Sequence, residues 1–188
     1  QADSFEGIGE AAFYGPKLDF MAQDALGREW QVATIQLDMN MPERFDLTCV
    51  NEEGAHERIV MIHAAIMGSI ERFLSILIEH TAGHFPLWLA PEQIRILPIG
   101  ERHQEYAAAV ARDLTQAGLR VSVDASSESL GKRIRNAKVG KLPYLVVVGD
   151  KEMEEGMLSV ESRTQGQIGA LTSASFVDTL LQEISEKR

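Results

Sequence analysis

The chain has 188 residues, of which 45% are hydrophobic, so it can form one large domain or two small ones with real cores. Its net charge of -10 argues against a general nucleic-acid binder, because non-specific affinity for nucleic acids comes from Lys and Arg that neutralise phosphates. The single cysteine excludes an intrachain disulfide and indicates a reducing, cytoplasmic setting. No apolar run reaches the roughly 18 uncharged residues of a membrane span, so we expect no membrane partner. Because the chain starts with Gln1 and shows no signal peptide, we expect it to be part of a longer protein.

The basic residues are concentrated in the second half of the chain. Residues 1–91 hold 5 Lys and Arg against 14 Asp and Glu, whereas residues 92–188 hold 13 against 14. Segment 83–93 carries two prolines and two aromatic residues without a clear period, which is typical of a boundary. The sequence therefore predicts two domains, 1–91 and 92–188, that divide near Pro91 and have different partners.

The first half begins with a predicted β-hairpin. In segment 13–41 apolar and polar residues alternate on both sides of a central turn, which predicts two antiparallel strands. Residues 57–63 predict a short apolar strand, and a helix begins at Gly68 and runs to Gly83. We expect the mostly apolar run 60–73, which joins this strand to the helix, to be buried.

The second half alternates between predicted strands and helices. The predicted strands are 94–99, 119–125, 143–149 and 158–163, and the predicted helices are 102–118, 129–140 and 175–187. Such alternation is typical of an α/β domain with a mostly parallel sheet.

Two polar residues stand out in the run 60–73. Arg72 lies in the first turn of the predicted helix, where free amides already carry partial positive charge, so a docked phosphate or carboxylate would explain it. The alternative is an arginine whose head reaches water or pairs with Glu71. His63 by itself is more typical of a hydrogen-bonded core residue than of a metal ligand, and Cys49 of a small buried one.

A basic face is predicted on the helix 129–140. Lys132, Arg135 and Lys138 follow one another at a spacing of three, which places them on one side of the helix. Such a face suits the phosphate backbone of a nucleic acid. A solvated basic face with no partner is equally compatible with the pattern.

Five segments carry a resemblance to a known family. In chain order they are FYGPKLDF, DALGREWQVATIQLDMNMPERFDL, VMIHAAIMGSIERF, FPLWLAP and LPYLVVVGDKE. In order and spacing they resemble the threonyl-tRNA synthetases, which are class II aminoacyl-tRNA synthetases, from about Ala11 to the C-terminus. The resemblance implies an α+β fold in 1–91, namely the last part of the antiparallel class II catalytic sheet with its third motif. It implies an α/β anticodon-binding domain with a mostly parallel, five-stranded mixed sheet in 92–188.

The activity that the resemblance implies is that of a threonine-tRNA ligase. Such an enzyme uses ATP to activate threonine and transfers it to tRNA(Thr) during protein biosynthesis in the cytoplasm. The implied cofactors are Zn2+ and Mg2+, with ATP as substrate, and the implied assembly is a homodimer through the catalytic domain. We expect the isolated chain to be inactive, because in the family two further zinc ligands and the motif 2 arginines belong upstream of Gln1.

The resemblance also implies roles for single residues. Arg72 corresponds to the third-motif arginine that contacts the ATP phosphate, and Gln31 and Ser69 correspond to residues at the same ATP site. His63 corresponds to a ligand of a zinc ion that holds threonine by its amino and hydroxyl groups and so excludes valine. The substrate-binding positions are Tyr14, Lys17 and Gln36.

The tRNA side both follows and departs from the family. Glu152 corresponds to a residue that reads an anticodon base, and the basic face of Lys132, Arg135 and Lys138 would contact tRNA. Glu161 stands where the family carries arginine, which reverses the charge of an RNA contact. Further departures are Val32, Ala33, Ala64, Ser126 and Ser127. They leave an alternative open: a divergent or non-catalytic paralogue that binds another RNA or a regulatory partner.

Overall fold

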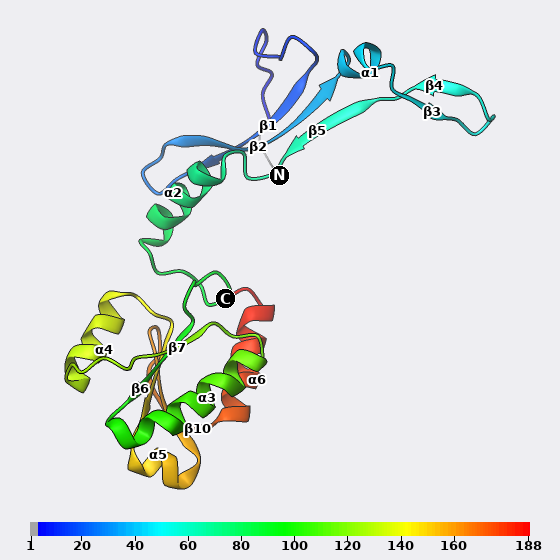
Figure 1. The fold of residues 1–188 in the computed structure, drawn as a ribbon. Helices are drawn as coiled ribbons and strands as arrows, with labels where there is room; N and C mark the ends of the chain where they lie inside the picture. Colours follow the sequence, from blue (N-terminus) through cyan, green and yellow to red (C-terminus); the bar gives the residue numbers. More distant parts are fainter. Residues whose placement is uncertain (1–3) are drawn as a thin grey trace. The chain divides into compact units, whose positions relative to one another are not determined.

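The computed structural model describes residues 4–188 of a chain that divides into two compact units, Gln1–His80 and Thr81–Arg188 (Figure 1). The sequence placed the boundary near Pro91, whereas the two units divide earlier. Leu87 is buried in the core of the second unit, which draws the segment before Pro91 into that unit. Within the described range, no helix combines the length and the apolar character that a membrane crossing demands.

A three-stranded antiparallel sheet forms the centre of the first unit. β1 (Lys17–Gln23) and β2 (Glu29–Asp38) are the predicted hairpin, which is confirmed. β5 (Met61–Ala65) pairs with the other edge of β2, so the strand order is β1-β2-β5. A bulge between Phe20 and Met21 shifts the register of β1 against β2, with consequences for the site described below.

The two faces of this sheet differ in chemistry. The register places Lys17, Gln36 and His63 side by side on one face, because each is the direct cross-strand partner of the next. Leu18 and Ile35 are partners on the opposite face, where 57% and 41% of their surface is exposed. The period of two along each strand therefore separates a polar face from an uncovered apolar one.

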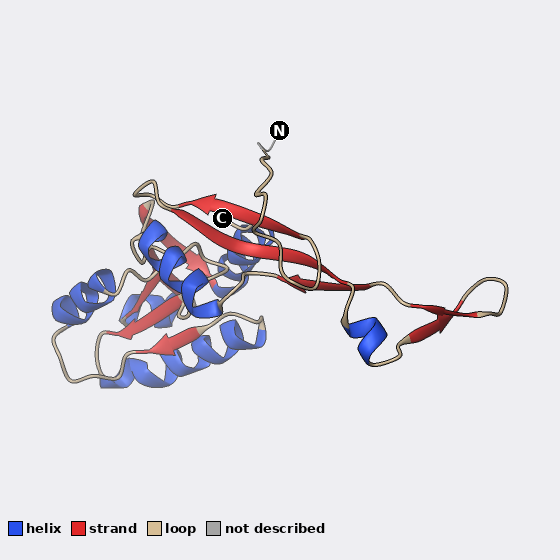
Figure 2. Cartoon of the chain, turned by 90° about the horizontal axis from the view of Figure 1, so that it is seen from above, coloured by secondary structure: helices blue, strands red, loops and turns tan. Residues whose placement is uncertain are grey.

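The connection between β2 and β5 contains a short helix and a small hairpin. α1 (Met41–Arg44) leads into a two-stranded hairpin of β3 (Thr48–Val50) and β4 (His56–Arg58), seen beyond α1 in Figure 2. The predicted strand 57–63 is consequently split between β4 and β5, because its two ends pair with different strands.

α2 (Ile70–Thr81) follows β5 and confirms the predicted helix. The turn before it contains Gly68, whose φ of 56° lies in the left-handed region that glycine adopts without strain. The expected burial of the run 60–73 is wrong, since Val60 and Ile62 are 74% and 63% exposed. β5 is an edge strand, and its apolar side has no covering layer within the described residues.

A five-stranded mixed sheet forms the second unit, as predicted. Its strands are β6 (Ile94–Pro98), β7 (Val121–Val123), β8 (Tyr144–Val148), β9 (Met157–Ser162) and β10 (Gly166–Thr172). The spatial order is β10-β9-β8-β6-β7. β6 is parallel to β7 and β8, and β9 is antiparallel to β8 and β10. The parallel part of the sheet is the part in which the sequence alternates strands with helices.

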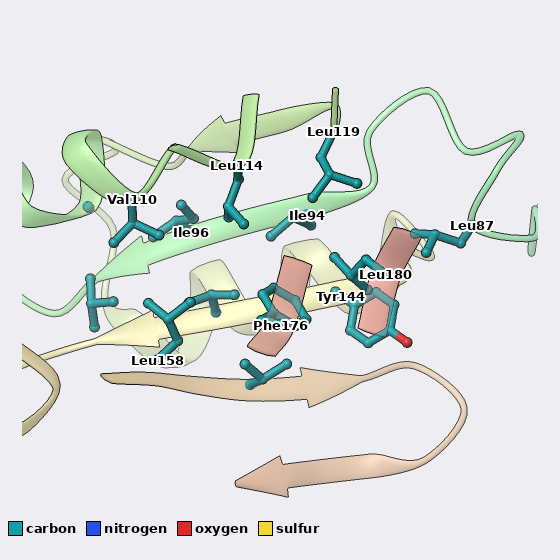
Figure 3. Packing of buried hydrophobic residues seen from close by; sticks show 14 residues of the cluster. Leu87, Ile94, Ile96, Val110, Leu114, Leu119, Tyr144, Leu158, Phe176 and Leu180 are labelled. Carbon is teal, nitrogen blue, oxygen red and sulfur yellow. The ribbon is translucent and has the colours of Figure 1, made fainter. Parts of the chain in front are cut away.

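Helices cover both faces of this sheet (Figure 1). They are the 3-10 turn Glu101–His103, α3 (Gln104–Gln116), α4 (Leu130–Val139), α5 (Asp150–Glu155) and α6 (Ser173–Ser185). In Figure 3 the side chains of Leu114 from α3 and Phe176 and Leu180 from α6 pack against Ile94 and Tyr144 of the sheet, all fully or almost fully buried. α4 packs on the opposite face through a smaller apolar cluster. The main core therefore lies between the sheet and the pair α3 and α6.

Two elements of the second unit, α5 and β10, were not predicted. β10 contains Gly166 and Gly169, both with positive φ, and its pairing with β9 is irregular between Gln167 and Gly169. α5 has only six residues, DKEMEE, most of them charged. Neither segment has the periodic apolar pattern from which a helix or strand is predicted.

Candidate functional site

The polar face of the first unit gathers several predicted site residues. Lys17, Gln36 and His63 form a row across β1, β2 and β5. Tyr14 joins this row from the segment before β1, since its hydroxyl donates to Gln36 Oε1 at 2.8 Å. The Tyr14 and His63 rings meet edge to face with their centroids 6.3 Å apart. The predicted threonine-binding and zinc-binding positions thus form one cluster.

Backbone pairing fixes the position of Tyr14. The Met39 N–H donates to the Tyr14 carbonyl at 2.9 Å, and the Leu37 N–H donates to the Pro16 carbonyl at 3.0 Å. Between them, a Cβ at Gly15 would lie 2.0 Å from the Leu37 carbonyl oxygen. Only glycine therefore allows this close approach, and any side chain at residue 15 would displace Tyr14.

Asp19 connects this cluster to the predicted ATP-site residue Gln31. The Asp19 carboxylate accepts hydrogen bonds from Lys17 Nζ at 2.5 Å, Gln31 Nε2 at 2.7 Å and Thr34 Oγ1 at 2.6 Å. The bonds from Lys17 and Thr34 lower the pKa of Asp19, so it is ionised at neutral pH. Gln31 reaches this face because the bulge skips Val32 in the pairing, which reverses the alternation of side chains beyond it.

A histidine–aspartate pair lies at the β5 side of the same face. His63 Nε2 lies 2.8 Å from Asp38 Oδ2, and Asp38 Oδ1 accepts the N–H groups of Asn40 and Met41, each at 2.9 Å. The Asp38 side chain is 4% exposed and that of His63 is 46% exposed. The hydrogen bonds from Met41 and His63 lower the pKa of Asp38 although burial opposes them. A fixed, ionised carboxylate therefore holds an accessible imidazole.

Arg72 lies in the first turn of α2, as predicted. Its backbone N–H is 3.4 Å from Ser69 Oγ, and its Nη1 is 3.5 Å from the carbonyl oxygen of Gln31. Glu71, the alternative partner, instead accepts the Ser69 hydroxyl at 2.7 Å, which lowers the pKa of Glu71. Across the described residues the Arg72 guanidinium makes no ion pair, so it remains open to an incoming anion.

The described residues do not assemble a metal site by themselves. It contains no group of three His, Cys, Asp or Glu side chains that could hold a metal ion. Cys49 is exposed, so its expected burial is wrong. The reason is that every residue of β3 and β4 is exposed, and these two strands have no apolar layer of their own. His63 is the one residue for which the sequence predicts a metal-ligand role, and that role stays a prediction.

Three residues of the polar face, Asp19, Thr34 and Asp38, were not predicted as site residues. Asp19 lies two residues after Lys17, and Thr34 and Asp38 lie two residues on either side of Gln36. The period of two that places residues on one face of a strand was therefore a usable signal. Their hydrogen bonds, in contrast, depend on which strands pair and in what register.

The predicted tRNA-binding face of α4 carries its own acidic partners. Lys132 Nζ lies 2.5 Å from Glu128 Oε1, and Lys138 Nζ lies 2.6 Å from Glu161 Oε1. Arg135 is exposed, and within the described chain no carboxylate pairs with it. The face is thus a row of three cations, two of which are already partly neutralised.

Two further charged residues of the second unit, Arg133 and Glu152, serve the fold. Arg133 is 5% exposed and donates to the carbonyl oxygens of Asp124 at 3.0 Å and Pro98 at 2.7 Å. Glu152 Oε2 accepts the Gly149 N–H at 3.0 Å, which caps the start of α5. The role of Glu152 in reading RNA stays a prediction, because a cap and an RNA contact use the same carboxylate.

Two family models match successive parts of the chain. The tRNA synthetase class II core domain (G, H, P, S and T) matches residues 3–81, and the anticodon binding domain matches residues 93–183. Together with the antiparallel sheet and the α/β unit, these matches define a class II aminoacyl-tRNA synthetase, represented by part of its core domain and by an anticodon-binding domain.

Comparison with individual proteins identifies the family within this class. The chain is 55% identical over 179 residues to threonine-tRNA ligase from Syntrophomonas wolfei, covering 95% of this chain and 28% of that protein. It is 55% identical over 185 residues to the ligase of Synechococcus elongatus, covering 98% and 31%. The RNA binding domain of threonyl-tRNA synthetase from Cryptosporidium parvum matches with a TM-score of 0.85 and 39% identity, over 93% of this chain and 44% of that one. The chain belongs to the threonyl-tRNA synthetase family and spans less than a third of these two ligases.

Proposed function

We propose that this chain is part of a threonine-tRNA ligase, in which the first unit takes part in activating threonine with ATP and the second unit binds tRNA(Thr). The observation that carries the proposal is the continuous set of side chains on the polar face of β1, β2 and β5. Asp19 links the expected threonine position Lys17 to the expected ATP position Gln31 through hydrogen bonds. The expected zinc position His63 adjoins this set as the cross-strand partner of Gln36 and through its ring contact with Tyr14. The family relationship supports a cytoplasmic homodimer that contributes to translation.

Arg72 is the residue that we assign to ATP. Its guanidinium has no ion pair among the described residues, and it lies at the first turn of α2, where backbone amides favour an anion. There it would bind the phosphate of ATP and stabilise the charge that develops when the threonine carboxylate displaces pyrophosphate. Gln31 and Ser69 contact Arg72 directly and would hold it in place, while Mg2+ would arrive with the nucleotide.

Tyr14, Lys17 and Gln36 are the residues that we assign to threonine, with His63 as a zinc ligand. The surroundings of His63 are compatible with metal binding. Asp38 contacts Nε2 of the ring, while Nδ1 has no hydrogen-bond partner among residues 4–188 and can bind a metal. When bound, zinc would supply a Lewis acid for the amino and hydroxyl groups of threonine, a combination that valine lacks. Further ligands would come from the rest of the full-length protein.

The exposed side of α4 is the surface that we assign to tRNA. Arg135, Lys132 and Lys138 present cations along this side, which suits contacts with phosphates. A pocket of about 240 Å³ opens beside Lys138 and Glu161 and combines charged with apolar side chains. An RNA base can use both kinds of contact, through its edge and its face.

Arg72→Ala in the full-length protein tests the proposed activity. We expect threonine-dependent ATP-pyrophosphate exchange to fall at least about 100-fold, because a donor aimed at developing charge typically contributes that much to the rate. Binding of tRNA(Thr) should be retained, since Arg72 lies in the other unit. Normal exchange by this variant would remove the assignment.

Arg44→Ala is the matched control. Arg44 is an exposed arginine at the end of α1 and is not among the residues of the polar face. Its loss should leave exchange at the wild-type rate. If the wild-type protein neither exchanges pyrophosphate nor charges tRNA(Thr), the non-catalytic paralogue becomes the better explanation.

A further inference from the structure

We propose that Asp38 is a positioning residue that fixes the tautomer of His63, so that Nδ1 is the ring nitrogen offered to a metal ion. The inference rests on the proposed role of His63 as a zinc ligand and adds the residue that orients it. Asp38 was not among the site residues predicted from the sequence.

The Asp38 carboxylate is anchored independently of His63. Its side chain is 4% exposed, and Oδ1 accepts two backbone N–H groups, from Asn40 and Met41, at the start of α1. Rotation of the carboxylate out of this position would break two hydrogen bonds to a charged acceptor, which are stronger than bonds to a neutral one. Oδ2 is therefore held toward His63 Nε2, at 2.8 Å.

The charge of Asp38 decides which nitrogen of His63 carries the proton. An aspartate carboxylate is ionised at neutral pH, so Asp38 accepts hydrogen bonds and cannot donate one. The contact of 2.8 Å then requires a proton on His63 Nε2. In a neutral imidazole, the lone pair that can bind a metal is consequently on Nδ1.

The free nitrogen belongs to an accessible ring on the polar face. The His63 side chain is 46% exposed, and no described residue forms a hydrogen bond with Nδ1. The ring lies against Tyr14 and beside Gln36, two positions that we assign to threonine. Metal-binding histidines commonly donate their other N–H to a carboxylate, which raises the basicity of the ligand and fixes its orientation. Asp38 and His63 show this arrangement.

Asp38→Asn in the 188-residue chain tests the tautomer directly. The asparagine oxygen should keep its two backbone donors, so its NH2 group would face His63 Nε2 and make that nitrogen an acceptor. We expect 15N spectra of histidine side chains to show the Nε2–H form of His63 in the wild type and the Nδ1–H form in the variant. His63→Gln assigns the signal. An Nδ1–H form in the folded wild-type chain would overturn the inference.

Zinc affinity of the full-length protein provides the second readout, by chelator competition and metal analysis. We expect Asp38→Asn to weaken zinc binding about 10- to 100-fold, and Asp38→Glu, which restores a carboxylate, to recover part of it. Asp24→Asn is the matched control, because Asp24 is also a buried carboxylate that accepts backbone and side-chain donors but not from a histidine. It should bind zinc normally.

The outcomes distinguish the zinc-ligand role of His63 from the positioning role of Asp38. If His63→Ala abolishes zinc binding but Asp38→Asn binds as tightly as wild type, the positioning role of Asp38 is wrong while the zinc assignment stands. If His63→Ala also retains zinc, both fail. Circular dichroism establishes that each variant is folded, and Asp38→Glu keeps the test valid should Asp38→Asn unfold.

Discussion

The two units of the chain bury different kinds of group. Among the described residues of the first unit, the buried side chains are Asp24, Asp38 and Pro42, whereas the second unit buries a cluster of aliphatic and aromatic residues. Apolar burial is non-directional and grows with area, but a buried carboxylate is tolerated only with its hydrogen bonds in place. The first unit is thus ordered by specific polar contacts around an open face, and the second by a closed core.

The same difference separates two histidine–aspartate pairs. His103 in the second unit is 3% exposed, its Nδ1 accepts the Gly100 N–H at 3.0 Å, and its Nε2 lies 2.9 Å from Asp150 Oδ1. Both ring nitrogens are therefore used inside the fold. His63 is exposed and has one nitrogen engaged, by Asp38. A histidine with one ring nitrogen free of hydrogen bonds can bind a ligand. A histidine whose two ring nitrogens are both hydrogen-bonded within the fold, as in His103, serves to hold parts of the chain together.

The largest effect on stability is expected for a substitution in the apolar core of the second unit. Phe176→Ala removes a fully buried ring that packs edge to face on Tyr144, so we expect a loss of about 3–5 kcal/mol in the free energy of unfolding. Urea denaturation followed by circular dichroism measures it. Phe20→Ala is the counterpart in the first unit, where the ring is 45% exposed, and should cost less than about 1 kcal/mol. Equal losses would contradict the comparison.

A smaller effect is expected for the polar edge of that core. The Tyr144 hydroxyl donates to Glu183 at 2.6 Å, and Tyr144→Phe should cost about 1–2 kcal/mol at neutral pH. Burial and the Glu183 carboxylate raise the pKa of Tyr144 above its ordinary value of 10.0. The folded state therefore keeps a proton that the unfolded state releases, and wild-type stability falls as the pH rises above about 10. This alkaline loss should be weaker in Tyr144→Phe, as denaturation at several pH values would show.

The first unit, in contrast, should lose stability at acidic pH. Burial by itself raises the pKa of Asp24, but hydrogen bonds from Trp30, Arg28 and Leu26 outweigh it and lower the pKa below 3.8. The pKa of Asp38 is lowered as well, so the unfolded state takes up protons first and stability is lost as the pH falls through the folded-state values.

Trp30 reports this acid transition, because its indole N–H donates to Asp24 at 2.8 Å. We expect its fluorescence to change below about pH 4 in a Trp88→Phe background, which leaves one tryptophan. Asp24→Asn should reduce the dependence on pH. An unchanged acid transition in that variant would show that Asp24 does not stabilise the first unit through its charge.

The smallest effect on stability is expected at the exposed ion pair of the tRNA-binding face. Glu161→Gln releases Lys138, whose side chain is 55% exposed, and should change the free energy of unfolding by less than about 0.5 kcal/mol. Its effect on RNA should be larger, since a freed cation can neutralise a further phosphate. We expect tighter tRNA binding and a salt dependence steeper by up to about one unit in log–log slope.

Fluorescence anisotropy with labelled tRNA at several salt concentrations measures this change. Arg133→Lys supplies the contrast, because Arg133 is buried and bonded to two carbonyl oxygens, so its change should lower stability without removing an exposed cation. If Glu161→Gln leaves both affinity and salt dependence unchanged, Lys138 does not contact RNA.

Local patterns were sufficient to predict many elements of the fold. The hairpin of β1 and β2, α2, and the alternating strands and helices of the second unit follow from apolar periodicity within single segments. α5 and β10 could not be predicted, because a short charged helix and a glycine-containing edge strand lack that periodicity. The burial of the run 60–73 was predicted wrongly, since an apolar composition does not say whether another layer covers the strand.

The sequence by itself determined which side chains share a face, and it carried the likeness to threonyl-tRNA synthetases, because both are properties of order along the chain. The tertiary structure decided which of those side chains are partners. Asp38 and His63 are 25 residues apart, and Lys138 and Glu161 lie on different elements, so their contacts depend on strand pairing and helix packing. Even the arrival of Gln31 on the polar face required a bulge that no local pattern encodes.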